Sequence, residues 1–225
     1  MILPPAMKTP FCLPLGLILV STALLAQPAA PPPATDATKA PAGPRTQRPP
    51  SPPGVDNFYK LSPDSLRMDG VPRGKFTDGK IIPSQIFPGT QHTYYVYVPA
   101  QYDPSKPTAL MVFCDGQAMM AEPGGVQGHV VLDNLIYRGE LPVMLGVFIN
   151  PGRRPDQPEP SAAGWGDRTA NRKEEYDTPN EKFARVLVEE LMPALKKDFN
   201  VSPDPEMHGI MGTSSGGIAA RFSPR

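Results

Sequence analysis

The residues best suited to chemistry lie near the end of the sequence, where residues 212–216 read Gly-Thr-Ser-Ser-Gly. This is the G-x-S-x-G spacing of a nucleophile elbow, in which a serine occupies a sharp turn between a strand and a helix. A strand-like run at residues 207–211 precedes it, and small or apolar residues at 217–220 follow it. The order strand, turn, helix favours Ser214 as the nucleophile of an acyl-transfer reaction over an ordinary Ser/Gly loop.

Acyl transfer builds negative charge on a carbonyl oxygen, so backbone N–H groups must already point toward that oxygen. One donor would be the N–H of Ser215, the residue after the nucleophile. The other would come from a loop that follows an earlier strand. Such a loop is Asp115-Gly116-Gln117, directly after the apolar run at 109–114. Because glycine permits close backbone approach, Gly116 or Gln117 is the second candidate donor, and an ordinary tight turn is the alternative.

A serine nucleophile also needs a general base and an acid that orients it. The three histidines, His92, His129 and His208, all precede Ser214, whereas in folds that carry this elbow the acid and the histidine follow the serine. We therefore expect all three to have structural or solvent-facing roles, with His208 packed beneath the elbow. We also expect the 225 residues to be an N-terminal portion that is inactive by itself.

The first 26 residues have the layout of a secretory signal peptide. Lys8 is followed by an apolar run at residues 11–25 and by a small residue, Ala26. The run is short for a membrane span and is interrupted by proline and glycine, so an uncleaved anchor is the weaker alternative. We expect a secreted or periplasmic protein with no stable membrane insertion after cleavage.

The composition of the remaining chain limits the classes of function. Residues 27–56 are rich in Pro, Ala and Thr and predict a disordered linker, which leaves 57–225 as the folded domain. The 22 basic and 22 acidic residues balance without a basic stripe, which argues against nucleic-acid binding. Of the two cysteines, Cys12 lies in the signal segment and Cys114 in an apolar strand, so we expect no disulfide framework, no metal site and no cofactor.

The folded part alternates predicted strands and helices. Continuous apolar runs are typical of strands that are covered on both faces, and the order of elements predicts an α/β fold with a mostly parallel sheet flanked by helices. The strands are expected at residues 94–98, 109–114, 143–149 and 208–211, and helices at 129–138 and 179–198.

The helix expected at 179–198 has the clearest signals. Thr178 fits an N-cap, Pro179 the first helical position and Glu181 the capping box. Pro193 should kink the helix or end its regular part early. One apolar stripe is expected to face the core rather than a cofactor: Phe183, Val186, Leu187, Leu191, Ala194 and Leu195.

Residues 61–220 resemble the esterases of the esterase D and enterochelin esterase type, a branch of the α/β-hydrolase superfamily that includes feruloyl esterase-like domains. The resemblance rests on the loop 115–117, on Arg172-x-x-Glu175-Tyr176 before the long helix, and on the glycine-rich segment 212–217. It implies an incomplete α/β-hydrolase sandwich and an exported serine carboxylic ester hydrolase. Arg172 and Glu175 are expected to brace the loop, with a substrate contact as the alternative.

Two other functions stay open at this point. A chain that keeps the cleft but lacks the base would be a non-catalytic pseudo-esterase or binding module, and an acyltransferase would differ only in the access of water. The expected partner is a small-molecule or polysaccharide-linked ester, such as a siderophore lactone or an acylated plant polysaccharide. Nothing in the sequence specifies an oligomeric state.

We predict that the exported chain begins near Gln27, because the charged start, apolar run and small residue match a cleavable leader. The intact mass of protein secreted by a native-type host measures the cleavage point. An exported form that still begins at the first residue would contradict the prediction.

Overall fold

The structure is a computed structural model and describes residues 61–122, 126–159 and 171–221. The predicted signal peptide and linker lie outside the described residues. None of the described helices combines the length and the apolar character that crossing a membrane requires. In chain order, the elements of the described residues are η2 (Pro63–Ser65), β1 (Lys75–Phe76), β2 (Lys80–Pro83), β3 (Gln91–Val98), β4 (Ala109–Cys114), α1 (Gly116–Met120), α2 (Gly128–Tyr137), β5 (Met144–Ile149), α3 (Arg172–Tyr176), α4 (Lys182–Arg185), η3 (Val186–Leu191), α5 (Met192–Leu195), η4 (Pro205–Met207), β6 (His208–Met211) and α6 (Ser215–Arg221).

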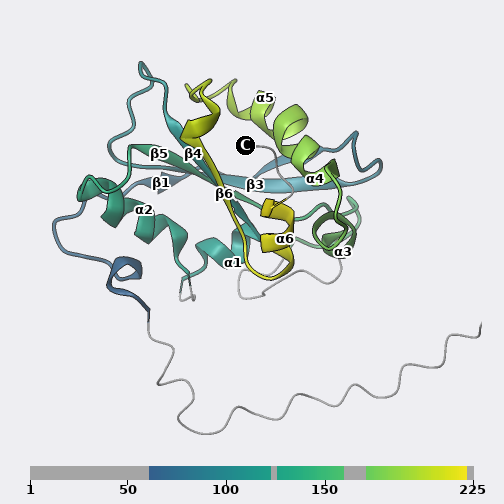
Figure 1. Ribbon diagram of the computed structural model, residues 1–225, viewed down its shortest axis with the longest axis horizontal. Helices are drawn as coiled ribbons and strands as arrows, with labels where there is room; N and C mark the ends of the chain where they lie inside the picture. Colours follow the sequence, from purple (N-terminus) through teal and green to yellow (C-terminus); the bar gives the residue numbers. More distant parts are fainter. Residues whose placement is uncertain (1–60, 123–125, 160–170, 222–225) are drawn as a thin grey trace, which may run out of the picture. The chain divides into compact units, whose positions relative to one another are not determined.

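The strands form one sheet in the order β1-β3-β5-β4-β6, with β2 also paired to β3 (Figure 1). Strand β4 pairs in parallel with β5 on one side and β6 on the other. The predicted α/β fold with a parallel central sheet is confirmed. The strand expected at 94–98 is longer, and β1, β2 and β3 all lie in antiparallel ladders. An apolar run alone does not indicate the direction of a strand, so the sequence could not distinguish this edge.

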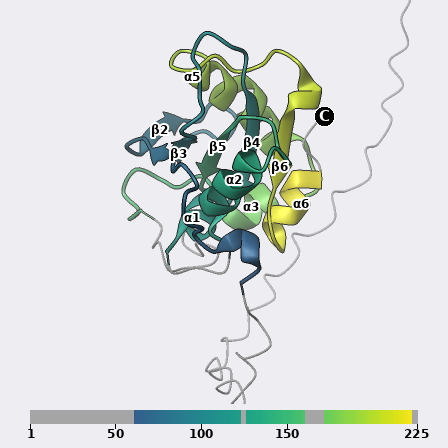
Figure 2. The ribbon, with the colours of Figure 1, turned by 90° about the vertical axis from the view of Figure 1, so that its left-hand side faces the viewer.

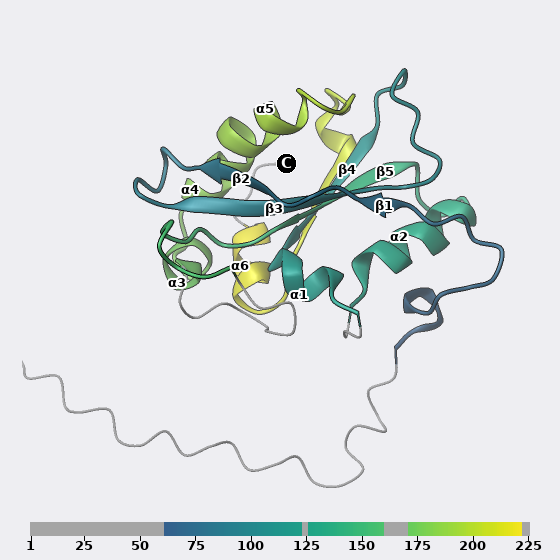
Figure 3. The same cartoon turned by 180° about the vertical axis from the view of Figure 1, so that it is seen from behind.

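Helices cover both faces of the sheet, which explains why its central strands are apolar throughout. All six residues of β5 are buried. Helices α1 and α2 pack on one face, and α3, α4, η3, α5 and α6 on the other. Figures 1 and 3 show α1 and α2 across the sheet from α4 and α5, and Figure 2 shows the same layers from the side. Each face therefore has its own apolar core.

Aromatic rings organise both cores. On the side of α1 and α2, the rings of Phe113 and Phe148 stack with centroids 4.4 Å apart. On the opposite side, Tyr176 of α3 and Phe183 of α4 meet edge to face at 4.8 Å. Such pairs add about 1 kcal/mol each beyond the area that they bury. The second pair joins α3 to the long helix.

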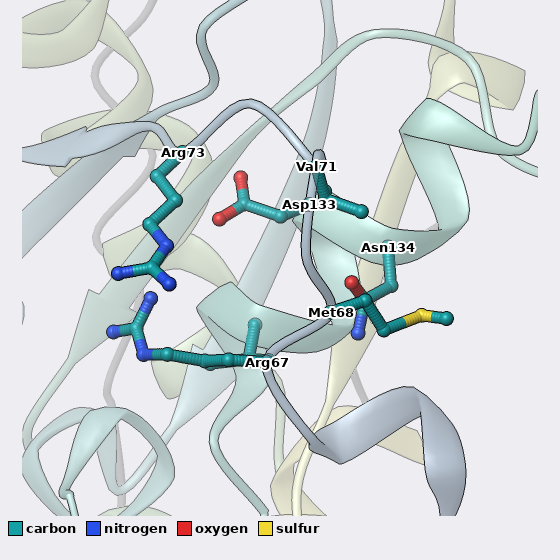
Figure 4. A pocket seen from close by; sticks show the side chains of 7 residues that line it. Arg67, Met68, Val71, Arg73, Asp133 and Asn134 are labelled. Atoms are coloured by element: carbon teal, nitrogen blue, oxygen red, sulfur yellow. The ribbon is translucent and has the colours of Figure 1, made fainter.

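Polar groups of α2 fasten the segment that precedes β1. The amide of Asn134 donates to the carbonyl oxygens of Asp64 and Leu66 at 2.8 and 2.9 Å. Asp133 accepts from the hydroxyl of Tyr97 at 2.6 Å and from the N–H of Gly74 at 3.3 Å. Burial, followed by the bond to Asp133, raises the pKa of Tyr97. A shallow hollow remains between the segment and the helix, and the side chains of Arg67 and Arg73 point toward each other across it (Figure 4).

The long helix begins later than predicted and changes type along its length. The Thr178 cap and the Glu181 capping box are wrong, because the Asn180 side chain accepts the Lys182 N–H at 2.8 Å and the helix starts there. The stretch η3 is π-helical and directly precedes the turn that contains Pro193. Proline has no N–H to continue the regular hydrogen-bond ladder, and helices commonly depart from regular α-helical geometry near proline. The predicted apolar stripe faces the core, with Ala194 only half-buried.

An apolar groove lies between this helix and the neighbouring strands. Among the described residues, β6 pairs on one side only, with β4, and each of its residues is half-buried. Val188 lies in the groove and is 53% exposed. The groove is lined by Leu110, Val112, Ala184, Leu187, Val188, Leu191, Met192, His208, Gly209 and Ile210. Unpaired strand edges beside apolar surface recruit other chains.

We therefore expect the 225-residue chain to associate through this groove, and we expect Val188→Lys to weaken that association. Tyr137→Lys is the control, because Tyr137 is equally exposed, at 56%, but lies on α2. Neither change should alter the free energy of unfolding by more than about 0.5 kcal/mol, since both sites are exposed. Light scattering against protein concentration measures association, and equal effects of the two variants would contradict the prediction.

Candidate active site

The ends of three parallel strands bring the candidate residues together. Because β4, β5 and β6 run in the same direction, their carboxyl ends meet at one edge of the sheet. The segments that follow them are 115–117, 150–152 and 212–215. The structure thus places Ser214, Ser215, Gly116 and Gln117 at one edge, where ligands of open α/β sheets bind.

Ser214 is exposed at the turn between β6 and α6 and has a φ angle of +54°. A non-glycine residue in this left-handed region costs about 1–3 kcal/mol and persists only where the surroundings enforce it. Helix α6 follows at once, because the N–H groups of Gly217 and Ile218 both donate to the Ser214 carbonyl at 3.0 and 3.2 Å. The turn therefore lifts the serine side chain away from the sheet.

Two glycines allow this turn to close. A side-chain carbon on Gly212 would lie 2.4 Å from the backbone carbonyl of Gly216, so the strand and the helix touch through their backbones. On the other side, a side-chain carbon on Gly216 would lie 3.2 Å from Oδ2 of Asp115. Ser215 is the first residue of α6, and the first N–H groups of a helix have no acceptor within it. Its N–H is thus available to a ligand at this edge.

The loop after β4 makes the second half of the arrangement. Asp115 is also left-handed, with a φ of +56°, and α1 begins directly after it at Gly116. A side-chain carbon on Gly116 would lie 2.3 Å from the backbone of Phe148 in β5, so this loop needs glycine. The N–H of Gln117 donates to Oδ1 of Asn150 at 3.1 Å. Of the two candidate donors, Gln117 is thus already engaged, and Gly116 keeps the N–H that has no acceptor within α1.

Arg172 of helix α3 braces this loop, as the sequence predicted, whereas Glu175 contacts the loop after β5 instead. The guanidinium of Arg172 makes a two-atom ion pair with the buried carboxylate of Asp115, at 2.7 and 2.8 Å. This bond raises the pKa of Arg172. The same guanidinium lies over the ring of Tyr176, 5.5 Å from its centroid, and the Tyr176 hydroxyl accepts the Asp115 N–H at 3.4 Å.

Glu175 braces the loop after β5. Its Oε2 accepts the Gly152 N–H at 3.0 Å and lies 3.0 Å from Nε2 of His92, and both side chains are fully buried. A side-chain carbon on Gly152 would lie 2.4 Å from the other Glu175 oxygen. His92 lies within β3 rather than before it. The pair fixes α3 against β3 and the end of β5.

The other two histidines are also engaged away from Ser214. Nε2 of His129 contacts Glu122 at 2.5 Å, and the ring lies against Phe76 and Tyr97. Nε2 of His208 lies 2.8 Å from the carbonyl oxygen of Ser202. His208 is at the first residue of β6, away from the elbow at its other end, so the expectation that it packs beneath the elbow is wrong.

Cys114 ends β4 beside the loop but does not compete with Ser214 as a nucleophile. It is fully buried, and burial raises its pKa to about 12, so it stays a neutral thiol near pH 7. No group of three His, Cys, Asp or Glu side chains in the described parts of the chain is arranged to hold a metal ion.

The comparison with protein families decides the relationship. The family described as Putative esterase matches residues 84–221, more than half of the chain. The chain belongs to this esterase family. The matched residues contain the loop after β4, the brace on α3 and the elbow. No curated protein matches the sequence.

A solved enterochelin esterase shares the fold of this esterase-family chain, and two solved feruloyl esterases are similar to it at lower TM-scores. The enterochelin esterase of Shigella flexneri is 20% identical with a TM-score of 0.50, covering 70% of this chain and 33% of that one. A ferulic acid esterase of Anaeromyces mucronatus is 22% identical with a TM-score of 0.48, covering 70% and 57%. A feruloyl esterase module of Clostridium thermocellum is 16% identical with a TM-score of 0.47, covering 73% and 53%. The chain spans little more than half the length of the first structures that it matches.

Sequence reasoning assigned no role to two contributors to this esterase-family site. Asn150, which is 2% exposed, accepts a hydrogen bond from the Gln117 N–H. Tyr176 contacts both Arg172 and Asp115. The signal for Asn150 was present, since it directly follows a buried strand that is parallel to β4. The position of Tyr176 depends on how α3 docks, which no local pattern reveals.

We predict that Gly212→Ala lowers the free energy of unfolding by about 3 kcal/mol, because the added carbon would meet backbone that cannot move aside. The control is Gly89→Ala, where φ is +81° and no atom lies within 4 Å of the added carbon. That change should cost only about 1 kcal/mol, the penalty of the left-handed backbone. Urea unfolding measures both, and equal losses would show that the strand and helix are not in backbone contact.

Proposed function

We propose that the chain carries the nucleophile-bearing part of an exported serine carboxylic ester hydrolase. The observation that carries the proposal is Ser214, an exposed non-glycine residue held at a φ of +54° between a parallel strand and a helix. Strain of this kind is found where a side chain must be presented to a ligand. The family relationship supports the same chemistry.

In the proposed reaction, Ser214 Oγ attacks the ester carbonyl carbon and passes its proton to a general base. The carbonyl oxygen becomes an oxyanion, which the N–H groups of Ser215 and Gly116 stabilise. The base then returns the proton to the departing alcohol as the carbon–oxygen bond breaks. Water hydrolyses the resulting acyl-serine ester by the same route and releases the carboxylic acid.

The described residues supply no histidine to act as that base. Nε2 of each of the three histidines contacts a group other than Ser214, and His92 is fully buried. We propose that the base and its acid come from residues outside the described part of a longer hydrolase. The greater length of the matched structures is consistent with this. The 225-residue chain alone is then inactive.

Export and substrate class complete the proposal. The leader-like first 26 residues support a secreted or periplasmic enzyme. Solved relatives of low identity have been studied with ferulic acid and with enterobactin. These molecules support the substrate classes expected from the sequence, namely acylated plant polysaccharides and siderophore lactones.

A non-catalytic pseudo-esterase is the second candidate, and one observation favours it. Nε2 of each of the three described histidines contacts a group other than Ser214, so none of them is placed as its proton acceptor. A pseudo-esterase would bind an ester in the same place without cleaving it.

Hydrolysis of an activated butyryl ester tests the proposal in a longer chain that includes the proposed base and its acid. Ser214→Ala should lower kcat/KM by several orders of magnitude, because it removes the nucleophile. The matched control is Ser215→Ala, which keeps the backbone N–H and should change kcat/KM by less than about tenfold. Equal effects of the two substitutions would show that Ser214 is not the nucleophile.

The 225-residue chain is assayed in parallel, and its rate of ester hydrolysis should not exceed that of its own Ser214→Ala variant. Ser214-dependent hydrolysis by this chain would contradict the proposed origin of the base and would place it among His92, His129 and His208. Binding of the ester without hydrolysis in the longer chain would favour the pseudo-esterase.

A further inference from the structure

The carboxylate of Asp115 connects three helices at the candidate active site. Its own backbone leads into α1, its oxygens pair with Arg172 of α3, and its Oδ2 lies 3.2 Å from where a side-chain carbon of Gly216 in α6 would stand. The residue after Asp115 is Gly116, and the residue before Gly216 is Ser215. The carboxylate is therefore one residue away from each of the two proposed N–H donors.

Arg172 is held so that it can fix this carboxylate in one orientation. Nε and Nη2 donate to the two Asp115 oxygens at 2.7 and 2.8 Å, a fork geometry that sets the plane of the carboxylate as well as its distance. The Tyr176 ring lies below the guanidinium, and the Tyr176 hydroxyl accepts the Asp115 N–H. Asp115 is thus held by side chain and backbone together, which can maintain its unfavourable φ of +56°.

We propose that Arg172 is a positioning residue: by holding Asp115 in the left-handed conformation, it orients the Gly116 N–H toward the point at which the Ser215 N–H also donates. The catalytic meaning of this orientation rests on the proposed function, whereas the conformational effect does not. Lysine cannot replace arginine here, because an ammonium group keeps the charge but lacks the fork that sets the carboxylate plane.

The sequence offers a selective probe of this loop. Asp-Gly occurs at 69–70, 78–79 and 115–116 only. In the 225-residue chain labelled with carbonyl-¹³C aspartate and ¹⁵N glycine, a carbonyl-to-amide correlation spectrum therefore contains signals from Gly70, Gly79 and Gly116 alone. The first two glycines lie outside the candidate active site and provide internal references.

Arg172→Lys should move or broaden the Gly116 signal while the Gly70 and Gly79 signals stay in place. The control is Arg185→Lys, because Arg185 makes the same two-atom pair with Glu189, at 2.7 and 3.0 Å, on the exposed surface of the long helix. This control should leave all three signals unchanged. A Gly116 signal that stays in place in a folded Arg172→Lys chain would overturn the proposal.

Gly216→Ala approaches the same carboxylate from α6 and decides the question if Arg172→Lys does not fold. The added carbon presses on Oδ2 of Asp115, so it should also displace the Gly116 signal. An unchanged Gly116 signal in a folded Gly216→Ala chain would overturn the proposal, since the carboxylate would then not connect α6 to the loop.

Kinetics in the longer hydrolase separate this inference from the proposed function. Arg172→Lys should lower kcat by about 100-fold, as expected for a small misplacement of a stabilising group, and leave KM nearly unchanged. A loss of kcat without displacement of the Gly116 signal would overturn the positioning role. Absence of Ser214-dependent hydrolysis in the longer chain would refute the proposed function, and the Gly116 signal would still decide whether Arg172 orients the loop.

Discussion

Strand β4 lies between two parallel partners, and the arrangement of the candidate active site depends on this placement. Its six residues pair with β5 on one side, and four of them pair with β6 on the other. Because all three strands end at the same edge, loops that are distant in sequence become neighbours. The apolar cores on both faces hold the strands in this register, since a shift by one residue would turn each side chain to the opposite face.

The parts of the fold that could be predicted are those that local physics determines. The runs at 109–114 and 208–211 are strands with the predicted bounds, because continuous apolar residues there are covered on both faces or lead into a glycine-bounded turn. The start of the long helix was mispredicted, because the Asn180 side-chain oxygen accepts the Lys182 N–H and the helix begins at Lys182 rather than at Pro179. The direction of β3 and the contact of His208 with Ser202 depend on tertiary packing, which no single segment encodes.

The candidate site is built largely from backbone, and its side chains mainly hold that backbone in place. Ser214 and Asp115 are both left-handed, and together they cost about 2–6 kcal/mol. That is a large part of the 5–15 kcal/mol or so by which domains are stable. The Arg172–Asp115 and Glu175–His92 contacts gather around α3, so this five-residue helix is central to the geometry although it carries no candidate nucleophile or N–H donor.

The backbone contact between Gly212 and Gly216 shows that one five-residue segment meets a structural and a chemical requirement at different positions. A substitution that removed the Ser214 hydroxyl would remove the proposed nucleophile, but β6 and α6 would still need glycine at position 212 to meet. Glycine at position 212 therefore serves the architecture of the turn, whereas the Ser214 hydroxyl serves only the proposed chemistry.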